Sequence, residues 1–107
     1  MKYPSQLQLL EFFGVEPVVQ DDVTAYTVSD DGGLALTLSF NTTDDSLQTS
    51  LQVGERVIAV VSQEGMTRFW ISEGVLMCEF VHEDVRINLV VSTHPKIYVE
   101  WSGLRSS

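Results

Sequence analysis

Cysteine, histidine and proline are scarce in this sequence of 107 residues, which contains one Cys, two His and three Pro. The single cysteine, Cys78, cannot form an internal disulfide, so nothing indicates an oxidising compartment. No apolar run approaches the roughly 18 residues that a transmembrane helix needs, and no signal-peptide pattern opens the sequence. We therefore expect a cytoplasmic protein that has no membrane partner.

Positive charge is also scarce. Six Lys and Arg oppose fifteen Asp and Glu, which gives a formal net charge of -9. Proteins bind nucleic acid and anionic membranes mainly through clustered Lys and Arg side chains, which this chain lacks. We therefore expect no nucleic-acid partner. A strongly negative field attracts basic partners instead.

Motifs for catalysis or metal binding are absent as well. His82 and His94 have no H-x-x-x-H spacing, no C-x-x-C is present, and Asp44-Asp45 lacks the oxygen series of a calcium loop. No nucleophile elbow or phosphate-binding glycine loop occurs. Cys78 alternates with apolar neighbours and is predicted to be a buried small hydrophobic residue. We expect no enzyme, no metal and no cofactor.

The length fits one domain over residues 1–107. A helix of about residues 5–13 is predicted, because Ser5 and Gln8 form a capping-box pattern and Gly14 is a good helix terminator. Such a short helix is not stable alone, so its aromatic side must dock on the rest of the protein.

The body of the chain, residues 22–102, has strand periodicity. Residues 34–40 and 47–53 alternate between apolar and polar, which is typical of antiparallel strands with one buried side. Residues 56–62 are apolar at nearly every position and are predicted to form a central strand covered on both faces. Strands every 8 to 12 residues indicate an antiparallel sandwich or barrel of about seven or eight strands with one short N-terminal helix. Residues 103–107 are expected to be a frayed tail.

Eight of the acidic residues form four adjacent pairs, each at a break in the hydrophobic pattern and therefore in a predicted turn. In a simple up-and-down arrangement, alternate turns lie at the same end of the sheet. That arrangement would gather acids, with no Lys or Arg in the same turns, into one purely acidic end. The residues are Asp21, Asp22, Asp44, Asp45, Glu64, Glu83 and Asp84.

Two interpretations of this acidic end remain open. Like charges that close together repel one another and reduce stability, which favours a binding role for them. Aspartate is also an ordinary turn residue, and acids keep a small β protein soluble. A Greek-key connection would scatter the turns.

Aromatic side chains provide two further candidate contacts. Phe69 and Trp70 are adjacent on one predicted strand and point to opposite faces, so one of them should be in the core. Trp70 and Tyr98 are the candidates for a partner interface, because Trp and Tyr are favoured anchors there.

The opening segment Leu9–Pro17, followed by Asp21-Asp22 and a first strand, resembles small immunity proteins of bacterial polymorphic-toxin and contact-dependent growth-inhibition systems. The likeness extends loosely to the strand-rich remainder, which ends in Trp101-Ser102-Gly103. The resemblance implies a cytoplasmic antitoxin that binds a cognate toxin domain, commonly a nuclease. It assigns no individual binding residue.

The charge agrees with this implication, because a nuclease needs a cationic cleft that an acidic protein can occupy. The leading hypothesis is an immunity protein that binds a basic toxin through the acidic end, Trp70 and Tyr98. The alternative is a β-barrel carrier that holds a small ligand in an internal cavity. A homodimer is not excluded.

Overall fold

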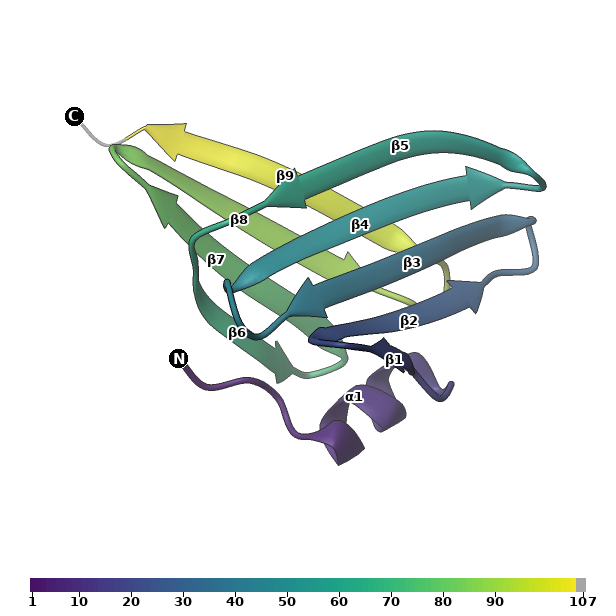
Figure 1. Cartoon of the computed structure of the whole chain (residues 1–107). Coiled ribbons are helices and arrows are strands. Elements are labelled where there is room, and N and C mark those ends of the chain that lie inside the picture. Colours follow the sequence, from purple (N-terminus) through teal and green to yellow (C-terminus); the bar gives the residue numbers. More distant parts are fainter. Residues whose placement is uncertain (106–107) are drawn as a thin grey trace.

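The structure, a computed structural model, describes residues 1–105, the last two as backbone alone. Within this range one helix precedes nine strands that form two antiparallel sheets (Figure 1). The elements are α1 (Gln6–Phe13), β1 (Val18–Gln20), β2 (Val23–Ser29), β3 (Leu34–Asn41), β4 (Ser46–Val53), β5 (Arg56–Gln63), β6 (Met66–Ser72), β7 (Val75–His82), β8 (Val85–Ser92) and β9 (Tyr98–Arg105).

The helix α1 has the predicted capping residues. The Ser5 hydroxyl accepts a hydrogen bond from the Gln8 backbone N–H, and the Gln8 side chain accepts one from the Ser5 backbone N–H. Gly14 ends the helix in the left-handed conformation, with a φ of 70°. The ring of Phe13 stacks on Tyr26 of β2 at a centroid distance of 4.6 Å, so the aromatic side of α1 is docked as expected.

Each strand pairs with the next one along the chain, except that β5 and β6 belong to different sheets. Over residues 1–105 the sheet orders are β1-β2-β3-β4-β5 and β6-β7-β8-β9, and no closed barrel forms. The predicted mainly β, antiparallel fold is confirmed. The strand count exceeds the predicted seven or eight because the short β1 pairs with β2 through three residues.

The C-terminal strand is longer than the sequence pattern indicated. β9 continues to Arg105, which lies opposite Val85 in the pairing with β8. Residues 103–105 are therefore part of the sheet rather than a frayed tail, because β8 is long enough to pair with them. Residues 106–107 of the predicted tail lie outside the described residues.

The core fills the space between the two sheets. Alternate residues of β3 and β7 are completely or almost completely buried, and the packing continues through aromatic contacts. Tyr3, before the helix, stacks on Phe40 of β3 and meets Phe69 of β6 edge-on. As predicted, one of the two adjacent aromatic residues is in the core: Phe69 is buried, and Trp70 is on the other face. The buried cluster comprises Leu9, Phe12, Phe13, Tyr26, Leu36, Leu38, Phe40, Leu47, Met66, Phe69, Leu76, Cys78, Phe80, Leu89 and Val91.

The prediction of a covered central strand at residues 56–62 is wrong. β5 is the last strand of its sheet, and all of residues 56–62 are exposed (Figure 1). Val57 and Val60 each have 54% of their surface exposed. The reason is the connection after β5, since Glu64 and Gly65 lead into β6 of the other sheet instead of a strand that would pair with β5.

Candidate protein-binding surface

Four connections rich in acidic residues follow one another along one end of the molecule. The β1–β2 turn contacts the β3–β4 turn through the Thr43 hydroxyl, which donates to Asp22 Oδ2 at 2.8 Å. The backbone N–H of Met66, at the start of β6, donates to the Asp45 carbonyl at 3.0 Å. The end of β7 joins the same series, because the Val81 N–H donates to the Gly65 carbonyl at 3.0 Å. The β7–β8 turn follows directly (Figure 1).

These contacts define a series of turns that we term the acidic row. Within each sheet the strands follow the up-and-down order that the sequence prediction assumed. The prediction that these turns lie at one end rested on that order. The row consists of Asp21, Asp22, Asp44, Asp45, Glu64, Glu83 and Asp84.

Part of the acidic row has a structural role of its own. Asp45 accepts a hydrogen bond from the Tyr3 hydroxyl, and Asp44 accepts one from Ser46 at 2.6 Å. Asp21, Asp45 and Glu83 have positive φ angles of 55°, 51° and 56°, and Asp is one of the residues that tolerate this conformation best. Turn geometry therefore explains why Asp occupies positions 21 and 45. Asp21, Glu64 and Glu83 are nevertheless exposed to solvent, where a partner can reach them.

The acidic end is not free of cations, contrary to the predicted purely acidic end. Arg86 follows Asp84 by two residues and lies opposite Val81 on the outer face of the four-stranded sheet. The turns themselves contain no Lys or Arg, but the first residues of β8 bring a positive charge close to them. Acids are therefore in excess at this end rather than alone.

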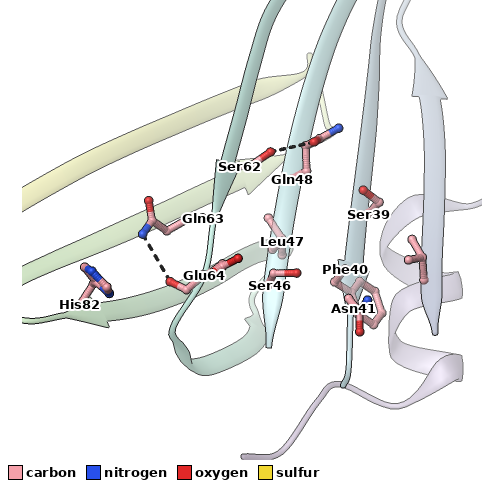
Figure 2. A pocket seen from close by; sticks show the side chains of 11 residues that line it. Ser39, Phe40, Asn41, Ser46, Leu47, Gln48, Ser62, Gln63, Glu64 and His82 are labelled. Carbon is pink, nitrogen blue, oxygen red and sulfur yellow. Dashed lines mark hydrogen bonds between the residues drawn. The ribbon is translucent and has the colours of Figure 1, made fainter. Parts of the chain in front are cut away.

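A groove of about 530 Å³ lies beside the acidic row (Figure 2). Strand register places its floor on the outer face of the five-stranded sheet, because Ser39, Gln48 and Ser62 lie directly opposite one another on β3, β4 and β5. Ser62 donates to the Gln48 side-chain oxygen at 2.7 Å. The complete lining is Val23, Ser39, Phe40, Asn41, Ser46, Leu47, Gln48, Ser62, Gln63, Glu64 and His82.

The groove presents hydrogen-bonding groups and one carboxylate beside the apolar side chains of Val23, Phe40 and Leu47. Its hydroxyl and amide groups donate and accept hydrogen bonds, and Glu64 supplies a carboxylate. Such a lining suits a polar segment that carries a cation. Sequence reasoning missed the groove because its polar residues are the outward positions of separate strands, and only the register brings them together.

The two aromatic candidates lie away from the acidic row. Trp70 and Tyr98 are on the outer face of the four-stranded sheet, on β6 and β9. The Arg68 guanidinium lies 3.9 Å from the centre of the Trp70 ring and covers it. Tyr98 is 50% exposed and donates to Glu100 at 2.7 Å, and this hydrogen bond is the main reason that the pKa of Tyr98 is raised.

Nucleophilic and metal-binding groups are not assembled at this surface. Cys78 is buried among apolar residues, and burial raises the pKa of its thiol. Within residues 1–105, no three His, Cys, Asp or Glu side chains come together as a metal site would require. No helix in the described part of the chain has the length and apolar character to cross a membrane.

The fold is similar to that of a chain in a contact-dependent growth inhibition toxin–immunity protein complex from Klebsiella pneumoniae 342. The TM-score is 0.86, and the match covers 95% of this chain and 96% of the other at 22% sequence identity. The resemblance suggested by the N-terminal segment is thus confirmed at the level of the fold. No protein-family model matches the sequence, and no curated protein matches it.

Proposed function

We propose that this chain is the immunity protein of a contact-dependent growth inhibition system, which binds and neutralises a cognate toxin domain in the cytoplasm. The observation that carries the proposal is the near-complete structural match to a chain of a toxin–immunity protein complex. Of the two roles in such a complex, the net charge of -9 fits the immunity protein, because a nuclease toxin requires cationic groups to bind phosphates. The chain acts by binding and not by catalysis.

The acidic row is the part of the surface that we assign to the toxin. A basic nuclease cleft and the exposed carboxylates of Asp21, Glu64 and Glu83 attract each other at long range. Opposite fields of this kind mainly increase the association rate and the specificity of a complex. Covering the cleft would deny it to the nucleic acid substrate, which is sufficient to neutralise the toxin.

The groove supplies the contacts that hold the complex after encounter. Tight binding depends on a few groups that become fully desolvated, whereas charges at the rim contribute less. A cationic side chain of the toxin that enters the groove would find Glu64 and the side-chain oxygens of Gln48 and Asn41. Glu64 belongs to both the row and the groove, so its removal should increase the dissociation rate as well as lower the association rate.

The experiment measures binding of this chain to the toxin domain encoded beside its gene. Three acids of the row are neutralised together as Asp21→Asn, Glu64→Gln and Glu83→Gln. We expect the association rate at low salt to fall by about tenfold or more, because mutation of rim charges acts mainly on this rate. The wild-type rate should decrease steeply as salt is added, since screening removes the long-range attraction.

A second triple variant provides the matched control. This variant also removes three negative charges, but from the turns at the opposite ends of the strands: Asp31→Asn, Glu55→Gln and Glu73→Gln. This variant should bind at nearly the wild-type rate. Equal losses in both variants would show that only net charge matters and would contradict the assignment of the acidic row. No binding of the wild-type chain to the toxin domain would refute the proposed function.

A further inference from the structure

The outer edge of β5 is the longest unpaired strand edge that the fold exposes on the five-stranded sheet. Among residues 1–105, β4 is the only strand that pairs with β5, and β5 is eight residues long. Its apolar side chains are exposed on both faces, with values of 54% for Val57, 53% for Ile58, 54% for Val60 and 37% for Val61. An edge with unpaired backbone groups and apolar side chains is a template for pairing with another strand.

The charge distribution along β5 indicates which strand fits this edge. Residues 57–63 contain no charged side chain, although the chain as a whole has a net charge of -9. Arg56, which follows Glu55 of the turn, precedes this neutral run, and Glu64 follows it. The edge is therefore neutral in the middle, with its one cation at the start and an acid just after the end, so an antiparallel copy would oppose Arg56 to Glu64.

We infer that β5 pairs with β5 of a second copy of this chain across a two-fold axis near Val60. Arg56 and Glu64 are each four residues from Val60 in the sequence. An antiparallel pair centred there consequently places Arg56 of each copy against Glu64 of the other. Such an interface is self-complementary, as two-fold symmetric dimers require, and it joins the two five-stranded sheets into one continuous sheet.

The local geometry of β5 is regular at the proposed axis. Leu51 of β4 lies opposite Ala59 and Gln52 lies opposite Val57, so Ile58 is an additional residue of β5. Residues 59–63 are paired regularly with β4, and this regular part contains Val60. The irregularity lies between Val60 and Arg56, and the two-fold symmetry repeats it on the other side of the axis.

The other edge of the same sheet does not offer an equivalent site. β1 also exposes apolar side chains, with values of 71% for Val18 and 64% for Val19. However, it has only three residues, and its sequence lacks an opposite pair of charges at its ends. Short edge strands are one of the ways in which proteins prevent pairing with another chain.

The test is sedimentation equilibrium of the purified chain over a range of protein concentrations. We expect a reversible shift from the 12.0 kDa monomer to twice this mass as concentration rises. Val60→Lys places two like charges at the axis and should abolish the shift. Val19→Lys, which introduces the same charge at the β1 edge, is the matched control and should leave the shift unchanged.

A charge swap tests the register directly. Arg56→Glu and Glu64→Arg should each weaken the dimer by about tenfold or more. By symmetry, each substitution places like charges opposite each other at both ends of the interface. The double variant Arg56→Glu/Glu64→Arg should restore dimer formation. A monomeric wild-type chain at every concentration would overturn the inference, and so would a dimer that Val60→Lys leaves intact. Single losses that the double variant fails to rescue would reject the proposed pairing. None of these results depends on the presence of a toxin.

Discussion

The indole N–H of Trp101 on β9 donates a hydrogen bond of 2.8 Å to the hydroxyl of Thr49 on β4. The two residues belong to different sheets, so this contact links the sheets through a polar group inside an otherwise apolar core. Thr49 is only 3% exposed. A buried donor without an acceptor is destabilising, because it has lost its hydrogen bond to water and gained none in the protein. The contact is therefore sensitive to substitution of Thr49.

Thr49→Val keeps the shape of the side chain and removes the acceptor of Trp101. We expect the free energy of unfolding to fall by about 1–3 kcal/mol, as measured by chemical denaturation followed through tryptophan fluorescence. Thr37→Val is the control, since its hydroxyl contacts Thr27 on the exposed outer face, and it should change stability by no more than about 0.5 kcal/mol. Equal effects would show that the link between the sheets contributes nothing specific.

The sequence predicts most of the strands, because the local signals are strong. Alternation over residues 34–40 and 47–53 identifies the paired strands β3 and β4, and the glycines and acids between strands identify the turns. The separation into two sheets was not predictable. Glu64-Gly65 has the composition of a hairpin turn, yet it connects strands of different sheets. Local residue preferences contain no information on which strand lies beside which.

The candidate site was predictable only in part, for a similar reason. The acids of the row are far apart in the sequence, but an assumed up-and-down strand order places their turns at one end of the sheet. The groove requires the exact alignment of Ser39, Gln48 and Ser62, which depends on register rather than on residue type. The sequence does not predict that β5 is exposed, because a continuous apolar run does not show whether other elements will cover it.

Phe13 connects the helix α1 to the sheet through its stack on Tyr26, and it also meets Phe12 of the same helix edge-on. Phe13→Ala should lower the free energy of unfolding by about 3–5 kcal/mol, because a large buried ring is replaced by a cavity. Leu7→Ala on the same helix removes a side chain that is 63% exposed and should cost about 0.5 kcal/mol or less. A small effect of Phe13→Ala would mean that α1 contributes little to stability.

Tyr3 should make stability depend on pH in the alkaline range. Desolvation, followed by the hydrogen bond to Asp45, raises the pKa of Tyr3 above its ordinary value of 10.0. The folded chain thus retains the phenol proton at a pH where the unfolded chain loses it. The resulting stabilisation is complete below pH 10.0 and decreases as pH rises above that value.

Tyr3→Phe is the variant that isolates this effect. Its free energy of unfolding should decrease less than that of the wild type between about pH 9 and pH 11, because it has no phenol to titrate. Tyr98→Phe serves as the control, since Tyr98 is also hydrogen-bonded to a carboxylate but is 50% exposed, and it should follow the wild-type curve more closely. Parallel curves for the wild type and Tyr3→Phe would exclude a contribution from Tyr3.

Gly65 occupies the most constrained position of the connection between the two sheets. Its φ is +79°, and a Cβ atom there would lie 2.7 Å from the carbonyl oxygen of Val81. Gly65→Ala should therefore cost about 1–2 kcal/mol for the left-handed conformation and about 1–3 kcal/mol more for the clash with backbone. The measurement is the free energy of unfolding by denaturant titration.

Gly74→Ala separates these two contributions. Gly74 has a similar φ of +77°, but no atom lies within 4 Å of a Cβ built on it, so this variant should show only the conformational cost. The difference between the two variants measures how closely the β5–β6 connection is held against β7. If Gly65→Ala is no more destabilising than Gly74→Ala, the end of β7 moves away from Gly65 at little cost. The spacing between Glu64 and the β7–β8 turn in the acidic row would then be adjustable rather than fixed.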